Sequence, residues 1–276
     1  MVDEVWQGRA VSPDGSPLID VGHFDAVDRS ASPGQFAAWM DHQRAQAADR
    51  AFAPLSIESG EAVLDIGCGT GVDLDAVAGL TQRATGVDLS RTMARKAKER
   101  ASHGRFSVAV ADGQWLPFRT ASFDAACCRA VLIHTPTPSR AVAELRRVLK
   151  PGGRAVLLEP DHGSHLVATT EQDVFERLLR HRRQTFLNPL VGRSLPALAT
   201  EAGLEVSSCH VFPIVHRSLA TALAAGGPFG KAVEAAVADG AITPAEAERY
   251  LASLEASDEN GTFLFAAASV MVTIKR

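Results

Sequence analysis

The sequence predicts an α/β protein whose core is a doubly wound, mostly parallel sheet. Short apolar runs alternate with helical patterns four or five times between residues 60 and 160, which is typical of a parallel sheet covered by helices. Residues 125–133 are almost continuously apolar, as expected of a central strand buried on both faces. Residues 63–71 pass from an apolar run into three glycines at alternate positions, which indicates a strand, a tight turn and a helix start.

The three glycines, Gly67, Gly69 and Gly71, are here called the glycine turn and predict a nucleotide-binding βα unit. They permit positive φ angles and let a ligand approach the backbone closely. The dinucleotide fingerprint G-x-G-x-x-G needs a third glycine at the position of Val72. Asp65 lies two residues before the turn, where a carboxylate disfavours a pyrophosphate but suits a ligand with an ammonium group.

This segment reads D-x-G-x-G-x-G and resembles motif I of the class I S-adenosylmethionine (SAM)-dependent methyltransferases. The alternative is an ordinary glycine-rich turn without a cofactor role. The resemblance implies that SAM is the cofactor and S-adenosylhomocysteine the product. The residues that it places at the cofactor are Asp65, Gly67, Cys68, Gly69 and Gly71.

Residues 84–90 predict a second strand that ends in an acid. Asp88 lies 17 residues beyond Gly71, close to the offset of about 20 residues expected of a ribose-binding acid. A carboxylate at this position can accept hydrogen bonds from both ribose hydroxyls. Ser90 then caps a helix that extends to about residue 100, and we interpret the basic face of this helix as solvated.

Residues 105–110 predict a third strand, which ends at Asp112 and Gly113. The Asp112 carboxylate is a candidate acceptor for the amino group of adenine. The apolar side chains expected to contact the same ring are Leu89, Met93 and Trp115.

Arg129 interrupts the fourth apolar run, residues 125–133. A charge in a buried strand is costly unless it is paired, so we expect Arg129 to point out of the strand end, toward the carboxylate of the cofactor. Ser139 starts a helix that ends at residues 150–153, and residues 155–159 predict the fifth strand.

The joint order of motifs resembles the small-molecule methyltransferases of the ubiquinone/menaquinone-biosynthesis type. Residues 145–153 read L-R-R-V-L-K-P-G-G, which is highly specific to this family in combination with the glycine turn. The resemblance covers roughly residues 60–160. It implies a Rossmann-like fold with seven strands and a reversed last strand, with SAM at the strand carboxyl ends and its methyl group directed toward a substrate pocket.

We predict a single domain, residues 1–276, with helical cap insertions. Residues 1–58 are interpreted as an N-terminal helical cap that contains a helix from Ser32 to about residue 52. The family resemblance suggests that this helix covers the cofactor and brings Arg44 near its carboxylate. The alternative is a helix that serves only in packing.

Residues 60–160 are interpreted as the SAM-binding core, and residues 161–276 as substrate-side helices with the last two strands. Helices are predicted after residue 169, from residue 194 and from residue 243. The strands are predicted at residues 205–215 and 263–274, with the final strand antiparallel.

Two histidines are candidate catalytic bases. A hydroxyl acceptor usually needs a base with a pKa near ~7, which is the natural range of histidine. His134 follows the fourth strand at the edge where ligands bind, and the family often carries histidine there. His162 follows the fifth strand at the same edge. For both, a structural role in a loop is the alternative, and a phenolate, thiolate or amine acceptor may need no base.

Asp161, His162 and His165 form the pattern D-H-x-x-H. We interpret them as pocket-lining loop residues and predict no metal, because no further ligand is visible in the sequence. His181, His210 and His216 fall on predicted helix or strand surfaces, and we assign them no role.

Composition excludes several classes of partner. The net charge is −4 with both signs interspersed, so we expect neither nucleic acid nor an anionic membrane as partner. No apolar run approaches the ~18 residues of a membrane span, and the acidic N-terminus does not resemble a signal peptide. The four cysteines form neither a disulfide framework nor a zinc pattern, which favours a cytoplasmic protein.

We therefore expect an enzyme that methylates a small molecule, favouring a hydroxyl oxygen of a secondary metabolite or a quinone- or phenol-like compound. N- or C-methylation is the alternative. A nicotinamide-dependent oxidoreductase and a non-catalytic SAM-binding protein are less favoured, the former because Val72 replaces the third glycine. The sequence leaves a monomer and a homodimer equally open.

Overall fold

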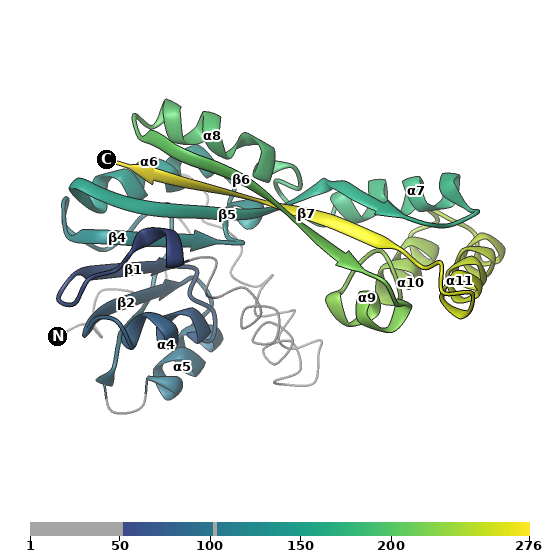
Figure 1. Ribbon diagram of the computed structural model, residues 1–276, viewed down its shortest axis with the longest axis horizontal. Helices are drawn as coiled ribbons and strands as arrows, with labels where there is room; N and C mark the ends of the chain where they lie inside the picture. Colours follow the sequence, from purple (N-terminus) through teal and green to yellow (C-terminus); the bar gives the residue numbers. More distant parts are fainter. Residues whose placement is uncertain (1–51, 102–103) are drawn as a thin grey trace.

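The computed structural model describes residues 52–101 and 104–276 (Figure 1). The strands in this part of the chain are β1 (Ala62–Ile66), β2 (Arg83–Asp88), β3 (Ser107–Val110), β4 (Phe123–Arg129), β5 (Leu149–Val167), β6 (Glu205–His216) and β7 (Phe265–Lys275). They form one sheet in the order β3-β2-β1-β4-β5-β7-β6. Strands β1 to β5 are parallel, whereas β7 is antiparallel to both β5 and β6. The predicted seven-stranded sheet with a reversed last strand is confirmed.

Helices cover both faces of this sheet. The described helices are α4 (Val72–Ala78), α5 (Arg91–Arg100), α6 (Pro138–Val148), α7 (Gln172–Arg183), α8 (Val191–Glu201), α9 (Leu219–Ala225), α10 (Lys231–Ala238) and α11 (Pro244–Glu259), with the 3₁₀ turns η1 (Ala53–Leu55) and η3 (Leu132–His134). Neighbouring side chains of a strand point to opposite faces. In β1, Leu64 shares a core with Leu145 of α6 and Leu195 of α8. The adjacent Val63 shares the opposite core with Leu74 of α4.

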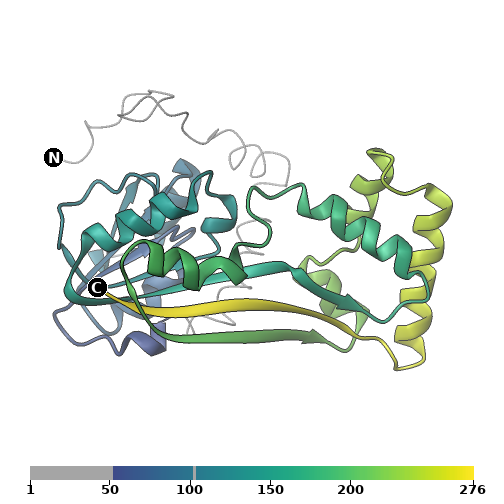
Figure 2. The same cartoon turned by 90° about the horizontal axis from the view of Figure 1, so that it is seen from above.

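Strands β5, β6 and β7 extend beyond the rest of the sheet and carry a second group of helices at their far end (Figures 1 and 2). Helices α7, α10 and α11 gather there around a core of their own, which includes Phe175, Tyr250 and Phe263. The pairing of β5 with β7 reaches this core, where Val167 lies opposite Phe265. The long strands therefore place this helical group across from the glycine turn, with a cavity between them.

The fourth strand is shorter than its apolar run predicts. Strand β4 ends at Arg129, and the residues after it turn into η3 instead of continuing to residue 133. Ala130 has a positive φ of 54°, and its N–H donates to Leu158 O at 2.9 Å. An apolar run does not reveal this change of direction, because Leu132 and Ile133 of η3 are as buried as the apolar residues of the strand.

The fifth strand is longer than predicted and runs to Val167. Asp161, His162 and His165 lie within it and not in a loop after it, so that part of the prediction is wrong. The pairing of β5 with β7 is irregular between Asp161 and Leu166. Around this irregularity, Asp161, His162 and His165 all line the cavity.

We predicted an N-terminal cap at residues 1–58. Residues 1–51 of this segment, Arg44 among them, lie outside the described part of the chain. Among the helices that are described, none is long and apolar enough to cross a membrane.

Candidate active site

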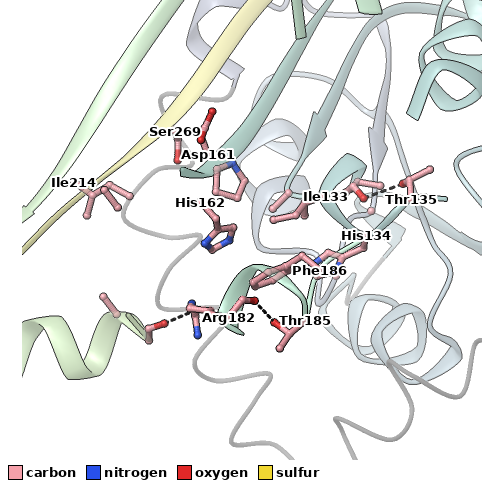
Figure 3. Close-up of a pocket in the computed structure, with 18 of the residues that line it drawn as sticks. Ile133, His134, Thr135, Asp161, His162, Arg182, Thr185, Phe186, Ile214 and Ser269 are labelled. Atoms are coloured by element: carbon pink, nitrogen blue, oxygen red, sulfur yellow. Dashed lines mark hydrogen bonds between the residues drawn. The ribbon is translucent and has the colours of Figure 1, made fainter. Parts of the chain in front are cut away.

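A cavity of about 610 Å³ lies at the carboxyl ends of the parallel strands, the edge where ligands bind in open α/β sheets. The glycine turn and the ends of β2 and β3 form one part of its wall, here called the glycine-turn side. The opposite wall, here called the ring side, is formed by η3, β5, the end of α7 and facing parts of β6 and β7 (Figure 3). This volume is typical of small-molecule sites.

The glycine turn wraps tightly around the end of β2. The N–H groups of Gly67 and Cys68 donate to Val87 O at 2.8 and 3.0 Å, and Gly67 has a φ of 71°. A Cβ on Gly67 would lie 2.2 Å from Val131 Cγ2, far inside van der Waals contact. Only glycine fits there, and the bare backbone forms the cradle that a closely approaching cofactor requires.

Asp88 is fixed at the cavity by two backbone bonds. Its Oδ2 accepts from Gly69 N and its Oδ1 accepts from Ser90 N, each at 2.8 Å. Both donors belong to turns that flank the end of β2, so the carboxylate is oriented before a ligand arrives. Leu89 and Met93, which the sequence suggests as apolar walls for an adenine ring, line the cavity beside it.

Asp112 and Gly113 line the same side of the cavity, at the end of β3. The Asp112 carboxylate is 3% exposed and accepts from Gln114 N at 2.8 Å. Trp115 does not line the cavity with them. The Arg140 guanidinium carbon lies 3.0 Å from the centre of the Trp115 ring, so the prediction that Trp115 contacts adenine is wrong.

Arg129 does not point out of the strand end, contrary to the prediction. Its guanidinium donates to Asp73 Oδ1 at 2.9 Å and forms a salt bridge to Oδ2 at 2.8 Å. The two side chains are only 6% and 0% exposed. Pairing makes this burial tolerable, and the partner comes from the first turn of α4. Arg129 therefore joins β4 to α4 and does not line the cavity.

Three other predicted cofactor residues lie behind the glycine-turn wall. Asp65 is buried within β1, and Cys68 packs in the core beneath the turn. Gly71 precedes α4 with a φ of 83° and approaches Ala97. None of the three lines the cavity, so the structure places them in and beneath the glycine turn, and their part in cofactor binding stays a prediction.

Six rings form a continuous row along the ring side, here called the ring row. In order they are His134, Phe186, His162, His165, Phe265 and His216. Successive centroids lie 5.7, 4.3, 5.0, 5.7 and 6.0 Å apart. His162 stacks with Phe186 and with His165 at interplanar angles of 17°. All six rings line the cavity, and such a wall suits an aromatic ligand.

A buried carboxylate holds the turn that carries His134. Glu159, which is fully buried, accepts from Val131 N and Leu132 N at 2.8 Å each. It also accepts from Ile133 N at 3.3 Å. The first N–H groups of a helical turn have no partner within the turn, and a negative charge at that end is favourable. Glu159 therefore fixes the position of His134 at the cavity.

The substitution Glu159→Gln is expected to lower the free energy of unfolding by about 2–3 kcal/mol, because the amide leaves at least one buried N–H group unsatisfied and removes the charge. Urea unfolding measures the change, with an unaltered m value as the sign of a pure stability effect. The exposed Glu248→Gln serves as a control and should stay within about 0.5 kcal/mol of wild type. Equal stability of the two variants would contradict the role of Glu159.

The environment of His162 makes it a weak base. Burial, together with the neighbouring His165 and Arg182, lowers the pKa of His162 to about 3. At neutral pH its ring is therefore uncharged, and its affinity for a proton lies far below the range that suits a general base. Of the two predicted bases, His162 fits the role less well than His134.

The low pKa of His162 makes folding stability depend on pH. The unfolded chain binds a proton at this residue below pH ~6.5, whereas the folded chain does so only near pH 3. The free energy of unfolding should therefore fall as the pH drops below ~6.5, with His162 contributing about 2 kcal/mol of loss by pH 4.5. Urea unfolding at pH ~6.5 and at pH 4.5 measures this loss, and the free energy of unfolding should fall less between the two pH values in His162→Phe than in wild type. The exposed His210→Phe should match wild type, and an equal loss in all three proteins would contradict this origin.

Several residues of the ring side carry no assignment from the sequence. His216 was predicted to lie on a strand surface without a role, but it lines the cavity, and so do Arg182, Thr185 and Phe186. The last three lie at or just after the end of α7. A polar and aromatic cluster ending a helix that follows the fifth strand is the sequence signal that could have identified them.

Asp161 also lines the cavity, but its charge is already matched. Arg193 donates to both of its carboxylate oxygens, at 2.6 and 2.7 Å. Although burial opposes ionisation, the bonds from Arg193 and from Gly163 N hold the pKa of Asp161 below its usual value.

Within the described part of the chain, no group of three or more His, Cys, Asp or Glu side chains is placed to hold a metal ion.

Comparisons with known proteins agree with this architecture. The family model described as a methyltransferase domain matches residues 64–157. The chain is 32% identical to an uncharacterized 37.1 kDa protein of transposon TN4556 from Streptomyces fradiae, over 90% of this chain and 73% of that protein. It is 31% identical to a ubiquinone biosynthesis O-methyltransferase of Thiobacillus denitrificans, over 55% of this chain and 67% of that protein.

A solved structure shows the same fold. Phosphoethanolamine N-methyltransferase 2 of Haemonchus contortus, in complex with S-adenosyl-L-methionine, superposes with a TM-score of 0.57 at 17% identity, covering 95% of this chain and 61% of that one. The matched residues run from within β1 to the first half of β5 and include the glycine turn and Asp88. SAM is accordingly the cofactor, and the chain belongs to the class I SAM-dependent methyltransferases.

Proposed function

We propose that this enzyme methylates a hydroxyl oxygen of a small aromatic acceptor, such as a phenol- or quinone-like compound or a secondary metabolite. One observation carries the proposal: a single cavity joins the glycine turn and Asp88 to the ring row that contains His134. One of the relatives is an O-methyltransferase named for ubiquinone biosynthesis, which fits an acceptor of this class.

On the glycine-turn side, we assign the cofactor to residues that line the cavity. Asp88 accepts from the ribose hydroxyls, and the bare backbone of the glycine turn faces the amino-acid part. Asp112 and Gly113 face the adenine edge, with Leu89 and Met93 on the faces of the ring. SAM supplies an activated methyl group, so the protein mainly has to align the acceptor and exclude water.

On the ring side, His134 takes the role of general base. It lies on η3, which Glu159 fixes at the carboxyl end of β4, and a neutral imidazole can accept the hydroxyl proton as the oxygen is methylated. His162 and Phe186 supply flat surfaces that hold an aromatic acceptor in place. Residues 161–276 thus shape the acceptor site together with η3, while the glycine turn and the ends of β2 and β3 hold the cofactor.

An amine or carbon acceptor is the second candidate, since a neutral amine or a stabilised carbanion can be methylated without a base. Turnover assays with the full chain and methyl-deuterated SAM separate the candidates, using catechol and aniline as matched probes. We expect S-adenosylhomocysteine formation and a labelled methyl ether from the hydroxyl probe only. Labelled N-methylaniline without any methyl ether would contradict oxygen methylation.

A further inference from the structure

The ring side contains a cation without a matching acid. Arg182 lines the cavity near the end of α7, and its guanidinium carries five N–H donors. Within the described residues, its side chain makes one hydrogen bond, to Gly226 O at 2.6 Å, and no salt bridge. Burial lowers the pKa of Arg182, with no neighbouring carboxylate opposing that shift.

Three buried nitrogen atoms on this side of the cavity have no hydrogen-bond partner among the described residues. They are Arg182 Nε, His162 Nδ1 and His216 Nε2. Buried polar atoms are satisfied in most proteins, and exceptions call for an explanation. The arginine nitrogen can only donate, and each imidazole can donate in one of its tautomers. Arg182 and the two histidines therefore have hydrogen-bonding capacity that the described residues leave unused.

Among the residues that the structure describes, no acid of the ring side balances this charge. Asp161 is bound through both oxygens to Arg193, and the remaining acids that line the cavity, Asp88 and Asp112, lie on the glycine-turn side. In Figure 3, Arg182 lies close to His162 and Phe186, and its guanidinium carbon is 5.7 Å from the centre of the Phe186 ring. The cation therefore borders the flat surface on which an aromatic acceptor would rest.

We propose that the acceptor is an aromatic compound that bears a carboxylate, and that Arg182 binds this carboxylate. The inference rests on the proposed function, since it concerns the acceptor of the same site. Arginine binds a carboxylate through two parallel N–H···O bonds, which would fix the orientation of the ring against Phe186 and His162. Arg182 is thus a positioning residue that selects anionic acceptors over neutral ones.

The test compares benzoate with benzamide, which has the same shape without the charge. Dissociation constants are measured by ligand-observed NMR titration of the full chain saturated with S-adenosylhomocysteine. We expect wild type to bind benzoate at least tenfold more tightly than benzamide. Arg182→Gln should lose at least tenfold in benzoate affinity with little change for benzamide.

Arg180→Gln is the matched control, because it removes the same charge from an exposed position of the same helix. It should leave benzoate binding within twofold of wild type. Equal affinity of wild type for the two probes would overturn the proposal. So would loss of benzoate binding in Arg180→Gln, which would place the anion in the hollow that Arg180 lines outside the active-site cavity.

Two further measurements keep the outcomes distinct. Failure of wild type to bind S-adenosylhomocysteine would refute the proposed function itself and not this inference alone. If Arg182→Gln weakens S-adenosylhomocysteine but not 5′-methylthioadenosine, which lacks the carboxylate, Arg182 binds the cofactor and the inference is wrong. If Arg182→Gln does not fold, the benzoate-to-benzamide ratio of wild type decides, supported by partial retention of benzoate affinity in Arg182→Lys.

Discussion

The substitution His134→Gln is expected to lower kcat by a factor of about 10²–10⁴ with a hydroxyl acceptor, which is the usual contribution of a general base. Glutamine keeps a hydrogen-bonding side chain of similar length on η3 but cannot take up the hydroxyl proton. Because His134 lies on the ring side and Asp88 on the glycine-turn side, the affinity for S-adenosylhomocysteine should stay within about twofold of wild type.

The control for this variant is His181→Gln, which changes a histidine of α7 that pairs with Asp239 at 2.8 Å and does not line the cavity. It should retain wild-type kcat. The pH profile adds a second readout, since the acidic limb of kcat for wild type should be absent in His134→Gln. An unchanged kcat and an unchanged pH profile in His134→Gln would exclude this histidine as the base.

The substitution Asp88→Ala is expected to weaken S-adenosylhomocysteine binding by about 100-fold, equivalent to about 3 kcal/mol. In the proposed assignment it removes charge-assisted bonds to the ribose, each worth about 1.5–3 kcal/mol. It also frees Gly69 N and Ser90 N, which the Asp88 carboxylate holds at 2.8 Å, so the glycine turn should loosen.

Calorimetric titration measures this loss, and thermal unfolding separates it from a failure to fold. Asp239→Asn, a change at a 68% exposed side chain on the surface, controls for the altered net charge. Wild type should be stabilised by SAM and S-adenosylhomocysteine and not by NAD⁺ or NADH. Undiminished binding in Asp88→Ala would show that the cofactor does not contact this carboxylate.

The parts of the fold that were predictable depend on local signals. Each of three features can be recognised from a stretch of about ten residues: the glycine turn, the acid that ends β2 and the apolar run of β4. Ser90, predicted to cap a helix, accepts from Met93 N at the start of α5. These signals lie in the first five strands. Seven of the residues that they single out as cofactor candidates line the cavity: Gly67, Gly69, Asp88, Leu89, Met93, Asp112 and Gly113.

The parts that were missed depend on contacts between distant segments. Arg129 finds its partner Asp73 56 residues away, and nothing near Arg129 in the sequence indicates that pairing. His216 reaches the cavity because β6 and β7 extend far beyond the parallel strands. Arg182 faces the same cavity because the extended strands place α7 opposite the glycine turn. Helical periodicity predicts which residues of α7 are buried, but it does not predict that the end of this helix faces the cavity.

The most direct test of the account is a crystal structure of the full chain with S-adenosylhomocysteine. It should show the ribose hydroxyls on Asp88, the adenine beside Asp112 and Met93, and the sulfur directed toward His134 and the ring row. An adenine stacked on the ring row, or a sulfur directed away from His134, would contradict the proposed division of the cavity into a cofactor side and an acceptor side.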